Sequence, residues 1–231
     1  MHSYKEEYYF DDIVIERGSC ISLDEINVSS SIPWEKQHAN TELKPVQHGS
    51  NEWFQVVNQV QTTLHNAKIV SLYRIQNKWL WDSYMQSKRR LAVKNKNRIN
   101  EKRLFHGSGK TPPDKIYRSE KGFDFRFASQ GLWGEGAYFA VDAKYSDGYA
   151  YVHGGWKQMF LALVLTGESC YHNQDNSLKK PPLKNSNQEE NMFADERYDS
   201  VRGNTCGSEI YVVYEHDKAY PAYLITYELL S

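Results

Sequence analysis

The stretch Leu104-Phe-His-Gly-Ser-Gly109 joins a hydrophobic pair, a histidine and a run of small residues. The apolar pair predicts the end of a buried strand, and the glycines predict that the strand stops there. A histidine at such a point lies beside an exposed backbone, so that a ring nitrogen and main-chain groups become available together. Taken alone, the pattern is more often typical of a structural histidine than of a functional one.

Two later segments extend this pattern. Gly134-Glu-Gly-Ala-Tyr-Phe-Ala140 places a tyrosine on a strand that follows two glycines, which permit a close backbone approach. It is not a dinucleotide fingerprint, because that motif needs a strand before it and a helix after it. Farther on, the stretches 210–214 and 219–227 each predict a strand, as do 104–105, 136–140 and 159–166.

The chain before residue 104 has helical patterns instead. Ser50 is a predicted N-cap for a helix from Asn51 to about Leu64, whose apolar residues recur at helical spacing. The stretch 68–75 predicts a strand, and Asn77 predicts the start of a second helix. Helices first and antiparallel strands later indicate an α+β fold.

The length of 231 residues fits one medium domain with a tail. The first 30 residues contain seven acidic and two basic side chains, so we expect residues 1–32 to be an acidic tail or linker and 33–231 to be the domain. The polar segment 172–197 predicts a long surface loop.

The net charge of −1 excludes a globally basic nucleic-acid-binding protein. Between Lys88 and Arg103 the chain has eight basic residues and one acidic residue. This stretch is either a phosphate-binding stripe or a solvated helix face and loop, and the second interpretation is favoured. A role in binding nucleic acid stays open as an alternative.

Membrane and secretory functions are disfavoured. The longest apolar run, 159–165, is much shorter than the ~20 residues that a membrane span needs, and the acidic N-terminus has no signal-peptide pattern. The cysteines Cys20, Cys170 and Cys206 are scattered, so neither a zinc site nor a disulfide framework is predicted. We therefore expect a protein of the cytosol or nucleus.

The order and spacing of six segments are specific when taken together: LFHGS at 104–108, GFDFR at 122–126, GEGAYFA at 134–140, LTG at 165–167, YDSV at 198–201 and AYPAYLITY at 219–227. From about Pro33 to Tyr227 the sequence resembles the catalytic domain of the poly(ADP-ribose) polymerase superfamily, the diphtheria-toxin-like ADP-ribosyltransferases. The resemblance implies two packed, mainly antiparallel β-sheets flanked by helices. It also implies NAD as the ADP-ribose donor, no metal, and proteins as acceptors, this chain included.

The resemblance implies a role for each matching residue. His106 would hydrogen-bond the 2′-hydroxyl of the nicotinamide ribose, Gly107 would clamp the carboxamide through its backbone, and Ser108 would reach the adenosine ribose. Tyr138 would pack on the nicotinamide ring, and Ser146 would hold the carboxamide.

Three further roles follow from the resemblance. A second tyrosine would stack on the other face of the nicotinamide, and both Tyr149 and Tyr151 fit, with Tyr149 preferred. The segment 122–134 would form a donor loop over the adenosine-phosphate end. In that loop Asp124 and Arg126 are candidates for binding, because a guanidinium can fork onto phosphate oxygens.

The third position of the family's catalytic triad decides the product. Chain-elongating members have a glutamate there, whereas counting back from Ala219 places Ile210 at this position. Glu209 is adjacent, and a slip of one residue would bring it into the site, but strand alternation points it to the opposite face. Without a carboxylate to activate a ribose hydroxyl, we expect mono-ADP-ribosyl transfer. The alternatives are an inactive nucleotide- or partner-binding module, an NAD glycohydrolase, and a poly-ADP-ribosyl transferase if Glu209 occupies the site.

Overall fold

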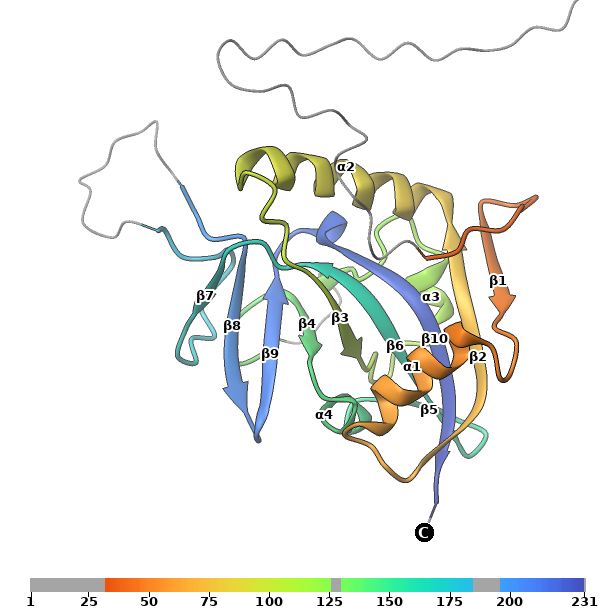
Figure 1. Ribbon diagram of the computed structural model, residues 1–231. Coiled ribbons are helices and arrows are strands. Elements are labelled where there is room, and N and C mark those ends of the chain that lie inside the picture. The colour runs from red at the N-terminus through yellow and green to blue at the C-terminus, as the bar shows by residue number, and fades with distance from the viewer. Residues whose placement is uncertain (1–31, 126–129, 185–195, 231) are drawn as a thin grey trace, which may run out of the picture. The chain divides into compact units, whose positions relative to one another are not determined.

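The computed structural model describes residues 32–125, 130–184 and 196–230 (Figure 1). Arg126 and Cys20 lie outside the described residues. The helices are α1 (Asn51–Gln61), α2 (Lys78–Lys94), α3 (Asp114–Tyr117), α4 (Ala143–Asp147) and the 3₁₀ turn η3 (His216–Lys218). The strands are β1 (Thr41–Pro45), β2 (Ala67–Asn77), β3 (Glu101–His106), β4 (Ala137–Ala140), β5 (Tyr151–His153), β6 (Trp156–Leu165), β7 (Ser169–Tyr171), β8 (Ser200–Thr205), β9 (Ser208–Val213) and β10 (Ala219–Leu229).

The α+β class and the mainly antiparallel pairing predicted from the sequence are confirmed. The strands follow the order β1-β2-β10-β6-β3-β4-β9-β8-β7, and β5 pairs with β6. Every ladder is antiparallel except that between β7 and β8. The expected two sheets correspond to two groups of strands joined at one residue pair, Phe105 with Ala140. This junction between β3 and β4 is also where the predicted site residues begin to meet.

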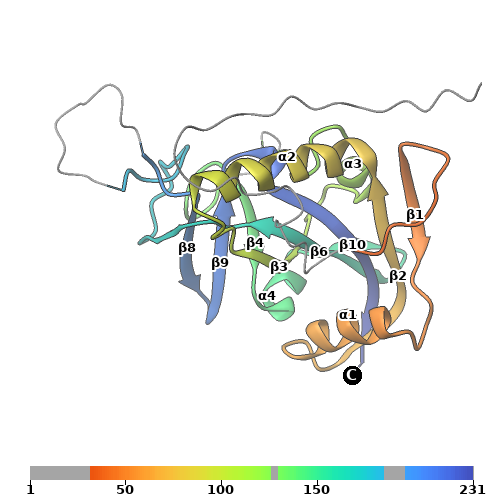
Figure 2. The ribbon, with the colours of Figure 1, turned by 45° about the horizontal axis from the view of Figure 1, so that its top comes forward.

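Strand β6 is central because both of its faces are buried. Met159, Leu161, Leu163 and Leu165 pack in a cluster that includes α1, α2 and β10. The alternate residues Phe160, Ala162 and Val164 pack in a second cluster with β4 and β9. A strand covered on both faces reads as a continuous apolar run, which explains why the stretch 159–165 is the longest in the chain. Figures 1 and 2 show α1 and α2 beside these strands.

The two long helices begin where the sequence predicts. The Ser50 side chain accepts a hydrogen bond from the Trp53 amide, and the Asn77 side chain accepts one from the Leu80 amide. These caps satisfy backbone donors that a first helical turn leaves without partners. Helix α1 ends at Gln61, three residues before the predicted end, although Leu64 is still buried.

Several side chains of the basic stretch 88–103 form ion pairs with acidic residues, and one of them is buried. Lys88 is only 3% exposed and lies 3.0 Å from the Glu101 carboxylate, which also accepts a hydrogen bond from Tyr84. Two other basic residues of the stretch form ion pairs: Arg90 with Asp217, and Lys94 with Asp199. The interpretation as a solvated helix face is therefore wrong for Lys88, because its ammonium group is buried against the Glu101 carboxylate.

The predicted surface loop 172–197 is partly anchored in its described portion. The Leu178 carbonyl accepts a hydrogen bond of 2.8 Å from the Glu135 amide, and Leu183 forms an isolated bridge with Arg197. The short strands β1, β5, β7 and β8 were not predicted. In the described part of the chain, no helix is long and apolar enough to cross a membrane.

Candidate active site

The three predicted triad positions lie on three neighbouring strands. His106 ends β3, Tyr138 lies on β4 and Ile210 lies on β9, in the sheet order β3-β4-β9. Ala140 of β4 pairs with Phe105 on one side and with Ile210 on the other. Residues separated by more than 100 positions in the sequence are thus brought together by strand pairing (Figure 1).

The hydrogen bond of His106 fixes the protonation of its ring. Nδ1 lies 2.8 Å from the Tyr138 carbonyl oxygen, which can only accept, so Nδ1 carries the proton and donates it. Burial lowers the pKa of His106 below its usual value, which favours the neutral ring. In a neutral ring with Nδ1 protonated, Nε2 is a hydrogen-bond acceptor. His106 is therefore suited to receive a hydrogen bond from a hydroxyl group.

Aromatic residues hold the imidazole in place. The ring centroid of His106 lies 4.8 Å from that of Phe123 and 5.4 Å from that of Phe139. Phe160 packs slightly farther away, at 6.4 Å. These contacts explain both the desolvation of the ring and its fixed orientation.

Tyr138 is anchored through its hydroxyl. The hydroxyl donates to the Gly134 carbonyl at 2.8 Å and accepts from the Trp133 amide at 2.9 Å. Burial raises the pKa of Tyr138 to about 12, so the phenol stays protonated and neutral. Gly131 lies directly on the ring, because a Cβ atom at that position would be 2.4 Å from Cζ of Tyr138. The packing of the tyrosine ring therefore requires a glycine at position 131.

Gly107 lies against the segment after β4. A Cβ atom on Gly107 would be 2.5 Å from the Tyr149 carbonyl carbon and 2.6 Å from the Ser146 carbonyl oxygen. The Gly109 amide donates to the Tyr149 carbonyl at 2.7 Å. Ser146 is buried beside this contact. The backbone of 107–109 and the Ser146 hydroxyl are therefore brought into one region of the structure.

Ser108 and Asp124, which were predicted to bind the adenosine end of NAD, contact different parts of the structure. The Ser108 hydroxyl donates to the Thr111 carbonyl at 2.8 Å. Asp124 lies 3.8 Å from Nε2 of His216, next to Phe125, whose ring stacks on His216 at 4.3 Å. These contacts fasten the start of the predicted donor loop to η3.

The two alternative stacking tyrosines have different surroundings. The Tyr149 side chain is exposed, and its ring lies 5.5 Å from that of Tyr145. Tyr151 lies on β5, and its ring stacks on His153 at 6.3 Å. The Tyr149 backbone lies against Gly107, and the choice between the two tyrosines stays open.

Ile210 and Glu209 point to opposite faces of β9. Ile210 is 1% exposed and packs with Trp133, Ala140 and Val212, against the same cluster as Tyr138. The Glu209 carboxylate forms an ion pair of 2.7 Å with Arg202. Burial, and after it the Glu209 carboxylate, raises the pKa of Tyr211, which packs in the cluster on the other face. The strand alternation expected from the sequence is therefore observed.

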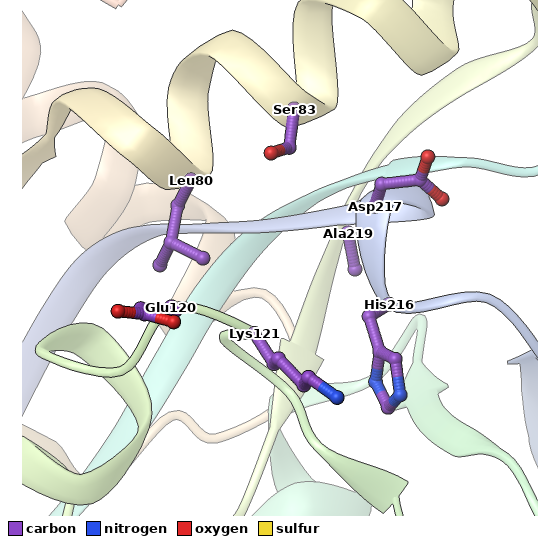
Figure 3. A pocket seen from close by; sticks show the side chains of 7 residues that line it. All are labelled: Leu80, Ser83, Glu120, Lys121, His216, Asp217 and Ala219. Atoms are coloured by element: carbon purple, nitrogen blue, oxygen red, sulfur yellow. The ribbon is translucent and has the colours of Figure 1, made fainter.

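Sequence reasoning did not single out Tyr145 or Leu178, both of which pack against the Ile210 cluster. A separate hollow, lined by Leu80, Ser83, Glu120, Lys121, His216, Asp217 and Ala219, opens between α2, the loop after α3 and η3 (Figure 3). None of the predicted site residues lines that hollow.

Comparison with known proteins agrees with this geometry. The family model described as the poly(ADP-ribose) polymerase catalytic domain matches residues 50–229. A probable poly [ADP-ribose] polymerase of Dictyostelium discoideum is 35% identical over 193 residues, which cover 80% of this chain and 52% of that protein.

Two human proteins are similar as well. Protein mono-ADP-ribosyltransferase PARP14 is 34% identical over 76% of this chain and 10% of its own length. Protein mono-ADP-ribosyltransferase PARP11 is 30% identical over 87% of this chain and 61% of its own length. The chain thus spans about half of the Dictyostelium relative and a tenth of PARP14. Because the family model covers most of the sequence, the chain belongs to the poly(ADP-ribose) polymerase catalytic domain family.

Proposed function

We propose that this protein is a mono-ADP-ribosyltransferase, which transfers ADP-ribose from NAD to protein side chains and releases nicotinamide. Membership of the family supports the use of NAD. The names of PARP11, PARP12 and PARP14, all mono-ADP-ribosyltransferases, support the transfer of single units. The acceptors include other proteins and this chain itself.

The observation that carries the proposal is the placement of Ile210. Its aliphatic side chain faces the same cluster as Tyr138, while the neighbouring carboxylate of Glu209 is bound to Arg202 on the other face. Elongation of a chain needs a group that activates a ribose hydroxyl, and isoleucine has none. A first transfer does not need that group when the acceptor brings its own nucleophile.

The other residues fit the binding of NAD. The Nε2 atom of neutral His106 accepts a hydrogen bond from a ribose hydroxyl. The hydroxyl of Ser146, a buried residue beside Gly107, binds the carboxamide. The backbone of Gly107 clamps the same group, and Tyr138 packs on the nicotinamide ring, with Tyr149 or Tyr151 on its other face. Holding the leaving group at several points orients the glycosidic bond for attack.

The rest of the chain is assigned on the resemblance. Ser108, Asp124 and Arg126 bind the adenosine-phosphate end of NAD. Residues 33–231 form the catalytic domain, and 1–32 form an acidic tail or linker. Ile32 packs in the core cluster of the domain, just before this proposed start.

Intact-mass spectrometry after incubation with NAD tests the proposed function. Discrete additions of single ADP-ribose units support mono-transfer, and a ladder of attached chains contradicts it. If no mass is added, nicotinamide in the same tube indicates a glycohydrolase or a missing acceptor. The absence of both products contradicts enzymatic activity and favours an inactive binding module.

The lowered pKa of His106 leads to a prediction of pH dependence. NAD binding is expected to persist as the pH falls to about 6.5, the usual pKa of histidine, and to weaken only below that pH. The unfolded chain takes up the proton at higher pH than the folded chain does, so protein stability also falls as the pH drops below about 6.5. Titration calorimetry with NAD between pH 5 and 8 measures the first effect. A midpoint above 6.5 would contradict the prediction.

Glu209→Gln is expected to leave NAD turnover within about twofold of the parent protein, because its carboxylate points away from the site and pairs with Arg202. A partly exposed ion pair contributes about 0–1 kcal/mol, so the stability change is small as well. Nicotinamide release measures the turnover. A large loss would indicate that Glu209, not Ile210, occupies the third triad position.

A further inference from the structure

Three side chains meet at the turn that follows α4. Asp147 is the last residue of α4, and its Oδ1 atom accepts hydrogen bonds from the Tyr227 hydroxyl at 2.6 Å and from Nζ of Lys157 at 2.7 Å. The two donors come from neighbouring strands, because Tyr227 of β10 pairs directly with Lys157 of β6. Nζ of Lys157 also donates to the Asp147 carbonyl oxygen at 3.3 Å. A single carboxylate thus joins this turn to two long strands of the sheet.

The same turn lies against the predicted carboxamide site. Ser146 directly precedes Asp147, and its carbonyl oxygen would be 2.6 Å from a Cβ atom on Gly107. The Tyr149 carbonyl lies as close to Gly107 and accepts a hydrogen bond from the Gly109 amide at 2.7 Å. Because these backbone contacts are close, a displacement of the turn at Asp147 changes the position of Ser146 relative to Gly107.

The two donors to Asp147 differ in rigidity. The Lys157 side chain is 28% exposed, and the four-carbon stem of a lysine is flexible, so its ammonium group can follow a carboxylate that moves. Tyr227 is fully buried, so its ring fixes the place of its hydroxyl. Burial raises the pKa of Tyr227, and the hydrogen bond to Asp147 raises it further, so the phenol stays protonated and donates. The position of the carboxylate is therefore set mainly by Tyr227.

We propose that Asp147 and Tyr227 are positioning residues for the nicotinamide end of NAD. Their hydrogen bond holds the turn after α4 so that Ser146 lies against Gly107, where both residues bind the carboxamide. Neither Asp147 nor Tyr227 touches NAD in this assignment, and both act through Ser146. The inference rests on the proposed function, which assigns Ser146 and Gly107 to the carboxamide.

Tyr227→Phe tests this assignment because it removes the hydroxyl and keeps the ring in its packing. The Kd for NAD is expected to rise about tenfold, the fold-change that corresponds to one hydrogen bond to a charged group. ADP-ribose has no nicotinamide, so its Kd is expected to change less than about twofold. Titration calorimetry with each of the two ligands measures the difference, which a general loss of stability would not produce.

Tyr223→Phe is the matched control. Tyr223 lies on the same strand, is 5% exposed, and donates its hydroxyl to the Glu52 carboxylate at 2.8 Å. That carboxylate keeps an ionic partner, Arg74, just as Asp147 keeps Lys157. The two variants are therefore expected to lose similar stability in thermal unfolding, and only Tyr227→Phe is expected to weaken the binding of NAD.

Two substitutions of Asp147 check that Tyr227 acts through this carboxylate. Asp147→Ala is expected to weaken NAD binding as Tyr227→Phe does, whereas Asp147→Asn keeps an oxygen that accepts from Tyr227 and is expected to stay within about threefold of the parent protein. In the Asp147→Ala protein, Tyr227→Phe is expected to have no further effect, because effects within one hydrogen-bonded pair do not add.

Three outcomes contradict the inference. A Kd for ADP-ribose that rises as much as the Kd for NAD would leave only a structural role for this link. Unchanged NAD affinity in both Tyr227→Phe and Asp147→Ala would exclude the positioning role and leave the proposed function intact. If the parent protein does not bind NAD, the proposed function itself fails, and the inference fails with it.

Discussion

His106→Ala is expected to lower NAD-dependent nicotinamide release by about 100-fold or more. The substitution removes the Nε2 acceptor that the hydrogen bond to the Tyr138 carbonyl prepares. It also removes a ring wedged among Phe123, Phe139 and Phe160, so the NAD ribose loses both its partner and a rigid wall. A misplacement of about 1 Å in a reacting group can alone cost about 10²-fold in rate. Nicotinamide release at saturating NAD measures the effect.

A loss of stability must be separated from a loss of chemistry in this variant. Truncating a buried ring leaves a cavity and is expected to cost about 2–4 kcal/mol of unfolding free energy. Leu163→Ala is the matched control: Leu163 is buried in the cluster with α1 and α2, and its truncation costs a similar free energy. Well below both melting temperatures, the control is expected to remain active. Activity of His106→Ala close to that of the control would exclude the proposed role of His106.

Local patterns in the sequence predicted the parts of the fold that depend on local chemistry. Ser50 and Asn77 start their helices because their side chains accept hydrogen bonds from amides in the first turn. The run 159–165 is a strand buried on both faces. The alternation that puts Ile210 and Glu209 on opposite faces of a strand was also predicted correctly.

Features that depend on distant partners could not be predicted in this way. Lys88 is buried because Glu101 and Tyr84 meet it, and nothing in the stretch 88–103 distinguishes it from exposed lysines. The short strands β1, β5 and β7 have three to five residues each, too few for a pattern to be recognised. Their conformation is imposed by the longer strands that they pair with.

Some site residues could likewise be predicted from local sequence motifs, and others could not. His106 and Tyr138 stand in motifs with glycines, and those glycines have packing reasons: a Cβ atom on Gly107 would be 2.5 Å from the Tyr149 carbonyl carbon, and one on Gly136 would be 2.6 Å from Cγ1 of Val212. Tyr145 has no such signal, because it is one of 17 tyrosines and only the folded chain brings it to the buried cluster that contains Ile210. A residue that acts through tertiary contacts alone is found only after the fold is known.

Ile210→Glu is expected to destabilise the protein and still to yield only single ADP-ribose additions. The side chain at this position is 1% exposed and packs among Trp133, Val201 and Val212. A carboxyl group there loses its hydration and is expected to cost about 2–4 kcal/mol, which lowers Tm by roughly 10 °C. Burial also raises the pKa of the new carboxyl, and a protonated carboxyl cannot accept the proton of a ribose hydroxyl. Thermal unfolding and intact-mass spectrometry measure the two effects.

Ile210→Gln separates the cost of the charge from the cost of the polar group. The glutamine has nearly the same shape and does not ionise. Because the folded pKa of the new glutamate is raised, the folded state binds its proton at higher pH than the unfolded state does, so stability falls as pH rises. The Tm difference between the glutamate and glutamine variants is therefore expected to be large at pH 8 and to shrink toward pH 5. A glutamate variant that is as stable as the glutamine variant at pH 8 and builds long chains would show that the wall at Ile210 is hydrated, and that isoleucine alone prevents elongation.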